Sequence, residues 1–382
     1  MRGLRLHVSP MLPLSLLALL HLYIGWRIVP LLPGAAGWTF AALLLASALL
    51  IPAAFLGRRA RRRATADRWS WAGMLALGVF GILLVLTLAR DALLLLAWPL
   101  GTAVPPLAAP SALGVPLLAA AATLWGLANA RRTARVKRVD VPIAGLPAPL
   151  HGFSIAQLSD IHVGPTVKRP YLQAIVDRVN ALEPDAVAIT GDLVDGRVQD
   201  LHQDVAPLAQ LRTRHGSFFV TGNHEYYSGA AEWTAHLRTL GIRVLMNEHV
   251  LLAHDGARLV MAGVTDPMAH HVEPADRSDP QRALAGAPTD ATGATPRVLL
   301  AHQPRTAEGA AAAGFDLQLS GHTHGGQIWP FNFFVPLQQP YTAGLHRLRQ
   351  LWVYTSRGTG YWGPPLRLGA PSEITLVRLV PA

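Results

Sequence analysis

Cysteine is absent from this sequence, so a disulfide framework and a thiolate metal site are both excluded. Charge is also scarce: charged residues make up 15% of the 382 residues, whereas hydrophobic residues make up 51%. This composition is too apolar for an ordinary soluble protein of this length and indicates membrane-spanning segments. Acidic residues are rarest in the first 130 positions, where Asp67 and Asp91 are the only two.

Four long apolar runs lie in this acid-poor part, at residues 8–26, 37–56, 69–88 and 113–130. Each run has about 18–20 residues, which as a helix crosses a hydrocarbon core of about 30 Å. We therefore predict a multi-span α-helical membrane region over residues 1–140, a linker over 141–150 and an α/β domain over 151–382. His21 is the one ionisable residue that we expect to be buried in these spans, which argues against a channel or transporter.

The net charge of +10 comes largely from arginine clusters at the ends of the apolar runs, at 58–63 and 131–138. Such clusters favour membrane topology signals over nucleic-acid binding, so we expect no nucleic-acid partner. Because basic residues mark the cytoplasmic side, we predict a multi-pass protein of the cell (inner) membrane with a cytoplasmic C-terminal domain. A fifth crossing at residues 91–110 would reverse that side, but the prolines there favour a loop or re-entrant segment. A cleaved signal peptide at the first run is a further alternative.

Five short polar motifs follow apolar, strand-like runs in the second half of the chain. They are Asp160-Ile161-His162, Gly191-Asp192, Gly222-Asn223-His224-Glu225, His302 and Gly321-His322-Thr323-His324. Strand-like and helix-like segments alternate here, and α/β folds gather their active sites at the carboxyl ends of strands. Imidazole, carboxylate and amide ligands suit Zn, Mn and Fe, so the motifs together predict a dinuclear metal site.

The order of these motifs resembles the calcineurin-like metallophosphoesterase family, and the Gly325-Gly326-Gln327 extension resembles its membrane-anchored bacterial branch. The resemblance covers roughly residues 150–382. It implies a four-layer α/β/β/α sandwich with two mixed sheets. It also implies a metal-dependent phosphoric ester hydrolase that cleaves a phosphodiester or pyrophosphate with a metal-bridging hydroxide.

The resemblance further implies a role for each motif residue. Two divalent ions, with Mn, Zn and Fe all open, would be held by seven ligands. Asp160, His162, Asp192 and His324 would hold the first ion, and Asp192, Asn223, His302 and His322 the second. Asp192 would bridge the two ions, and His224 would be the catalytic acid that protonates the leaving oxygen. Apart from the resemblance, Glu225 is expected either to begin a helix or to support the site rather than to bind metal, and Asp195 either orients a ligand or only turns the chain.

Several alternatives stay open at this level. Arg305 and Arg357 are either phosphate-binding residues or surface arginines. The segment Trp329-Pro330-Phe331-Asn332-Phe333-Phe334 is more typical of core packing than of an apolar rim that contacts membrane or an acyl chain. The expected partners are the lipid bilayer and a phosphoester substrate, with lipid linkage open. A narrower function is a UDP-2,3-diacylglucosamine-type pyrophosphatase of lipid A synthesis, and a non-enzymatic one is a membrane scaffold or sensor.

Overall fold

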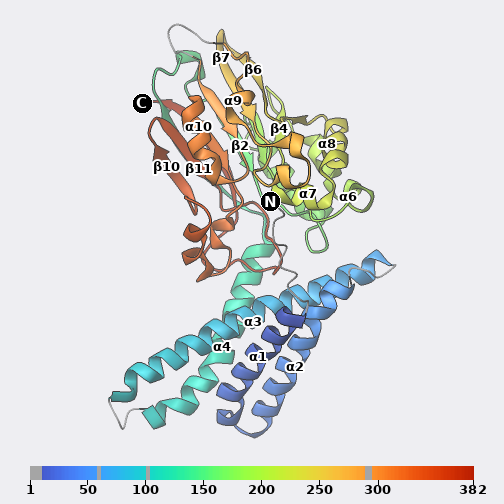
Figure 1. Ribbon diagram of the computed structural model, residues 1–382, viewed down its shortest axis with the longest axis vertical. Helices are drawn as coiled ribbons and strands as arrows, with labels where there is room; N and C mark the ends of the chain where they lie inside the picture. The colour runs from blue at the N-terminus through green and yellow to red at the C-terminus, as the bar shows by residue number, and fades with distance from the viewer. Residues whose placement is uncertain (1–10, 58–61, 100–103, 289–294) are drawn as a thin grey trace, which may run out of the picture. The chain divides into compact units, whose positions relative to one another are not determined.

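The computed structural model describes residues 11–57, 62–99, 104–288 and 295–382. The chain divides into two compact units. The first consists of residues 1–128 with 363–366, and the second of residues 129–362 with 367–382. Figure 1 shows that the first is built of long helices and the second of strands with shorter helices.

The first unit contains four helices that are long and apolar enough to cross a membrane. They are α1 (Met11–Ile28), α2 (Gly34–Gly57), α3 (Arg63–Ala97) and α4 (Val104–Arg131). Four long apolar helices are therefore confirmed among the described residues, whereas the bounds of the membrane spans stay a prediction, and residues 8–10 of the first span lie outside the described residues. Residues 91–97 extend α3 and residues 104–110 begin α4, so the described part of 91–110 is helical and not the expected loop. At 35 residues, α3 is about 52 Å long and exceeds the thickness of a hydrocarbon core.

A network of charged side chains joins α1, α3 and α4. Asp91 accepts hydrogen bonds from Tyr23 Oη at 2.6 Å, from Arg27 Nε at 2.7 Å and from Arg90 Nη1 at 3.0 Å. Arg90 also donates to Ser111 Oγ at 3.0 Å and is only 5% exposed. Arg27, Arg90 and Asp91 lie just outside the predicted spans 8–26 and 69–88, so the expectation that His21 is the one buried ionisable residue of the spans is not contradicted. Hydropathy averaged along the sequence does not reveal this network, because each of its charged residues stands at the end of a long apolar run.

The second unit contains two six-stranded mixed sheets (Figure 1). The first sheet has the order β1 (Arg135–Ile143), β12 (Glu373–Pro381), β2 (Ser154–Leu158), β3 (Ala186–Thr190), β4 (Ser217–Val220) and β5 (Arg243–Val244). The second has the order β10 (Gly344–Leu348), β11 (Leu351–Thr355), β9 (Leu317–Ser320), β8 (Arg297–Leu300), β7 (Ala257–Gly263) and β6 (Glu248–His254). In each sheet, four consecutive strands run parallel, β2-β3-β4-β5 and β11-β9-β8-β7.

Three hydrophobic cores show that the sheets and helices form four layers. On β3, Val187 and Ile189 pack in the core with helices α5 (Arg169–Asn180), α6 (Val198–Val205) and α8 (Ala230–Thr239). Ala186 and Ala188 point to the other face and pack in the core between the two sheets. A third core joins the second sheet to α9 (Pro280–Ala283) and α10 (Ala307–Ala313). The alternation along β3 is what a strand buried on both faces requires, and the α/β/β/α sandwich is confirmed.

Strand β1 is the main element that the sequence did not predict. It pairs in parallel with β12 over residues 135–143, so the sheet begins before the expected linker at 141–150. Pro142 fits this position because β1 is an edge strand, where a missing N–H leaves no ladder bond unmade.

The network around Asp91 should stabilise the membrane unit. In Asp91→Ala, the guanidinium groups of Arg27 and Arg90 lose their shared carboxylate, and the buried Arg90 charge becomes uncompensated. We expect the midpoint of thermal unfolding in detergent to fall by about 5 °C or more, whereas Thr39→Ala, which removes an exposed hydroxyl on α2, should change it little. An unchanged midpoint in Asp91→Ala would contradict a stabilising role.

Candidate metal centre

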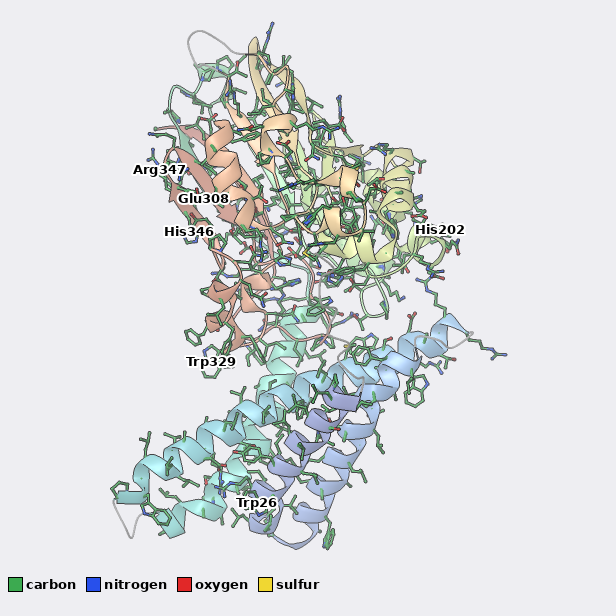
Figure 2. All side chains as sticks on the ribbon, viewed as in Figure 1. Trp26, His202, Glu308, Trp329, His346 and Arg347 are labelled. Atoms are coloured by element: carbon green, nitrogen blue, oxygen red, sulfur yellow. The ribbon has the colours of Figure 1, made fainter. Side chains whose placement is uncertain are left out.

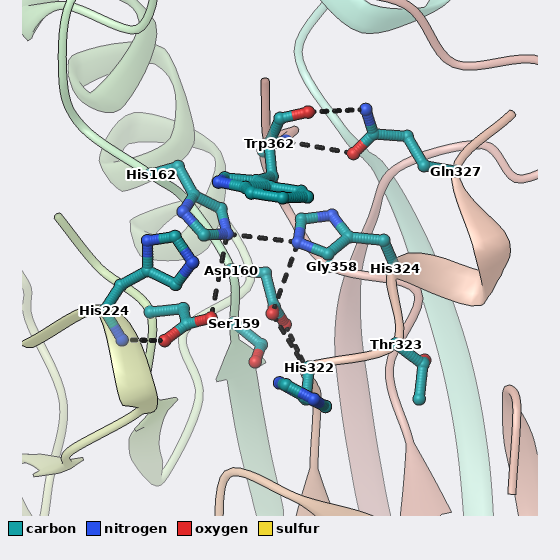
Figure 3. Close-up of polar contacts among 12 residues, drawn as sticks. Ser159, Asp160, His162, His224, His322, Thr323, His324, Gln327, Gly358 and Trp362 are labelled. Carbon is teal, nitrogen blue, oxygen red and sulfur yellow. Dashed lines mark hydrogen bonds and ion pairs between the residues drawn. The ribbon is translucent and has the colours of Figure 1, made fainter. Parts of the chain in front are cut away.

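All seven predicted ligands follow the carboxyl ends of strands in the second unit, and six of them lie in two groups of neighbouring ligand atoms. Asp160 and His162 follow β2, Asp192 follows β3 and Asn223 follows β4 in the first sheet; His302 follows β8 and His322 and His324 follow β9 in the second. Figure 3 shows several of these side chains converging on one region. Five of the seven have backbone φ between 50° and 70°, a region that non-glycine residues seldom adopt. Such strained positions cluster at functional sites.

The first ligand group consists of Asp160, His162 and His324, whose ligand atoms lie within 4.8 Å of one another. The Nε2 atoms of His162 and His324 face each other at 3.0 Å, and Asp160 Oδ1 lies 3.5 Å from His324 Nε2. The opposite ring nitrogens are held from outside the group. His162 Nδ1 contacts Asp195 Oδ1 at 3.1 Å, and His324 Nδ1 lies 3.1 Å from Arg367 Nη2.

The second ligand group consists of Asp192, His302 and His322. His302 Nε2 lies 3.1 Å from Asp192 Oδ2 and 3.2 Å from His322 Nδ1. The backbone carbonyl of Thr190 accepts a hydrogen bond from His302 Nδ1 at 2.8 Å, so Nε2 is the nitrogen that can bind a metal ion. Burial tends to lower the pKa of His302, but Asp192 and Asp160 outweigh it and raise that pKa well above its usual range, so metal binding would have to displace the proton on Nε2. Asp192 also lies within 4.8 Å of His162 and His224 ligand atoms, so its carboxylate is shared by both groups.

These residues fit a pair of divalent cations. Asn223 Oδ1 is buried without a hydrogen-bond partner, and a buried amide oxygen without a partner costs free energy unless a donor or cation satisfies it. Two pairs of imidazole nitrogens face each other across 3.0 Å and 3.2 Å, an arrangement that a bound cation between them would stabilise. The donor set of imidazole, carboxylate and amide is the one that Zn, Mn and Fe accept.

The charge states also suit metal ligands. Burial and the neighbouring positive charge of His302 lower the pKa of His322 to about 3, so its ring is a neutral base at neutral pH. Burial tends to raise the pKa of Asp192, but the charge and hydrogen bond of His302 outweigh it and hold that pKa well below its usual range. Ligands must be deprotonated to bind metal, and both residues meet this condition.

Glu225 holds two of the ligand loops together. Its carboxylate accepts backbone N–H groups from Gly222 at 2.6 Å, Leu193 at 2.8 Å and Asp192 at 3.0 Å. The loops after β3 and β4 approach so closely that a Cβ atom at Gly222 would lie 2.2 Å from Asp192 Oδ1, which explains the glycine. The Glu225 carboxylate accepts from backbone N–H groups, in agreement with a residue that supports the site and does not bind metal.

Asp195 connects His224 to the first ligand group. Its Oδ1 atom contacts His224 Nδ1 at 2.5 Å as well as His162 Nδ1. Burial lowers the pKa of His224, but the Asp195 hydrogen bond and the charges of Asp192, Asp195 and Glu225 outweigh it and raise that pKa to about 9. His224 is therefore protonated at neutral pH and can donate a proton. Of the two interpretations of Asp195 from sequence, the contacts support the orienting one.

Three residues near the site could not be identified as site residues from the sequence. Arg367 is fully buried, and it donates to the His324 and Gly360 carbonyls besides its contact with the His324 ring. The His224 imidazole makes edge-to-face contacts with Trp362 and Tyr227, at ring-centroid distances of 5.7 Å and 5.5 Å. None of the three stands in a recognisable motif, and an arginine between leucines gives no indication of burial.

The two arginines predicted to bind phosphate have protein partners of their own. Arg305 is exposed and donates to the Gln338 carbonyl at 2.8 Å, and Arg357 Nη1 pairs with Glu373 at 3.3 Å. Phosphate binding by either residue stays a prediction.

Several known proteins are similar to this chain. A bovine protein named transmembrane protein with metallophosphoesterase domain is 42% identical over 79% of this chain and 72% of its own length. A protein of the same name from Danio rerio is 40% identical over 69% and 61%, and a Campylobacter jejuni metallophosphoesterase is 39% identical over 66% and 64%. The solved 5'-nucleotidase precursor from Thermus thermophilus aligns with 55% of this chain and 49% of its own, at 18% identity and a TM-score of 0.38.

Residues 153–326 match the calcineurin-like phosphoesterase family, and this range includes every predicted metal ligand and His224. The four apolar helices precede that range, and two of the relatives carry the word transmembrane in their names. The chain therefore belongs to the calcineurin-like metallophosphoesterases, a family of metal-dependent phosphoester hydrolases.

Proposed function

We propose that this chain is a membrane-anchored phosphoesterase that uses two divalent metal ions to hydrolyse a phosphodiester or a pyrophosphate. The observation that carries the proposal is the convergence of two ligand groups that share Asp192, with His224 beside them. His224 donates its backbone N–H to Asp192 Oδ1 at 2.9 Å, so the proton donor and the shared ligand are held together.

Each part of the centre has a chemical task in such a reaction. Two bound cations would neutralise phosphate charge and lower the pKa of water. The seven ligands Asp160, His162, Asp192, Asn223, His302, His322 and His324 would hold these cations. His224 would donate its proton to the leaving oxygen, and Asp195 would keep the ring in the orientation that this transfer needs.

The charges beside the spans support a location for the proposed enzyme. Arg62, Arg63 and Arg68 lie near the start of α3, and Arg131 and Arg132 follow the apolar part of α4. Arg27 and Arg90, at the other ends of α1 and α3, are both hydrogen-bonded to Asp91. This asymmetry supports the inner membrane and a cytoplasmic metal centre.

The two alternative functions are not favoured. A non-catalytic scaffold or sensor has no need for the complete ligand set or for His224, and both are in place. The relatives' names mention no nucleotide-linked lipid, so the diacylglucosamine pyrophosphatase has no support beyond the membrane anchor.

Removal of the shared carboxylate tests the proposal directly. In Asp192→Ala, the second ligand group loses a member and His162 of the first group loses the carboxylate beside it, so we expect kcat/KM of the Mn-loaded protein for bis(p-nitrophenyl) phosphate to fall by about 1,000-fold or more. Asp177→Ala on α5, which removes an exposed carboxylate, should retain wild-type activity. Full activity in Asp192→Ala would overturn the assigned centre.

The number of metal ions can be counted. After chelation and dialysis we expect the wild-type protein to bind two Mn²⁺ per chain and His322→Ala to bind about one, because only the second group loses a ligand. Elemental analysis of the reloaded proteins gives the stoichiometry. Chelated protein should be inactive and should recover with added metal, and a wild-type stoichiometry of one would contradict the dinuclear assignment.

The pH profile tests the pairing of His224 with Asp195. The raised pKa of His224 keeps its acid form up to about pH 9, so activity should be lost as pH rises through that pKa. Asp195→Asn removes the carboxylate charge, lowers the pKa of His224 and should move the alkaline loss of kcat to lower pH by about one unit. A drop in kcat without any shift of the profile would mean that Asp195 acts only through structure.

A further inference from the structure

Six large apolar side chains of the second unit are exposed close to the metal motifs. We call this set the apolar rim; it consists of Trp329 (51% exposed), Phe331 (49%), Phe333 (66%), Phe334 (58%), Leu337 (81%) and Trp362 (54%). Figure 2 shows Trp329 at the edge of this unit with its side chain pointing outward. The sequence favoured core packing for residues 329–334, and the structure shows that this expectation is wrong.

The apolar rim is fixed to the metal centre by short connections. Only two residues separate His324 from Gln327, whose side chain donates to the Trp362 carbonyl at 2.8 Å and accepts from the Trp362 N–H at 2.9 Å. Gly326 has a φ of +82° and approaches Asn332 so closely that a Cβ atom there would lie 2.3 Å from the Asn332 Cα. The turn after the last metal motif therefore sets the positions of Phe331, Phe333 and Phe334.

Trp362 brings the apolar rim to the side of the centre where the leaving group is released. Its indole ring lies 5.7 Å from the His224 ring, and Figure 3 shows it turned toward the group of histidines. Tyr227, 67% exposed, contacts His224 from a separate element, α7 (Asn223–Ser228). The group that leaves with a proton from His224 would thus meet aromatic surface.

We propose that the substrate is an amphiphilic lipid phosphoester, with its phosphate at the metal centre and its hydrocarbon chain along the apolar rim. The inference rests on the proposed function and names the substrate class for that same site. Large exposed apolar side chains beside a catalytic centre mark a candidate binding site, and Trp362 lies next to His224, where it would contact the substrate. The four membrane spans add a reason, because they keep the chain in the bilayer where amphiphiles are concentrated. Trp362 is then a specificity-determining residue.

Alkyl phosphates of two lengths test the proposal without knowledge of the lipid headgroup. Full-length, Mn-loaded protein in detergent micelles would be equilibrated with radiolabelled butyl or octyl phosphate, and the dissociation constants measured by dialysis. The variants are Phe333→Ser/Phe334→Ser, which removes two exposed rings of the apolar rim, and Leu251→Ser, a control at an exposed leucine of β6. Partition into micelles is equal for all proteins, so it cancels in the ratio of variant to wild type.

We expect the double variant to bind octyl phosphate at least five-fold more weakly than wild type, and butyl phosphate within two-fold, since we expect only the longer chain to extend past Trp362 to Phe333 and Phe334. Leu251→Ser should match wild type for both ligands. Equal weakening of both ligands, or no weakening of either, overturns the proposal. If the dissociation constants do not depend on chain length in this way, the apolar rim would instead fit a protein partner. Hydrolysis of bis(p-nitrophenyl) phosphate by the wild-type protein is measured separately, and its absence would contradict the proposed function. The dialysis result decides the lipid inference by itself.

Discussion

The burial of two carboxylates beside four imidazoles is the constraint on which the rest of the second unit depends. Asp160 and Asp192 are at most 2% exposed, and charges taken out of water are tolerated only with compensating charges and hydrogen bonds. Asp160 accepts the His322 N–H at 2.9 Å, and Asp192 accepts the His224 N–H. The first of these bonds joins a loop of one sheet to a loop of the other. The ligand geometry therefore depends on how the two sheets are packed against each other.

Most of the centre could be predicted because its chemistry is local in sequence. Asp160 and His162, or His322 and His324, are separated by one residue each, and each pair directly follows an apolar strand. The groups that act on the ligands from a distance could not be predicted. Arg367 contacts His324 from 43 residues further along the chain, and Trp362 reaches His224 across an even longer separation. Nothing in their neighbours reveals such contacts, because only the tertiary fold creates them.

The limits of the prediction elsewhere have similar causes. Hydropathy identified four spans, but it could not show that α3 continues to Ala97 or that Arg27 and Arg90 share Asp91. Aromatic composition alone does not distinguish core from surface, so residues 329–334 were assigned to the wrong environment. Strand β1, with the sequence Arg-Val-Lys-Arg-Val-Asp-Val-Pro-Ile, follows a basic cluster and reads as a polar connection until its partner β12 is known.

The pairing of β1 with β12 affects where the second unit can be cut from the four apolar helices. A chain cut at the boundary expected from sequence, near residue 150, would lack the strand that covers one side of β12. Residues 373–381 would then present unpaired backbone groups along a strand rich in valine and leucine, the kind of edge that recruits strands from other molecules. Insolubility of such a fragment would therefore reflect a lost neighbour in the sheet, and a cut before Arg135 preserves that neighbour.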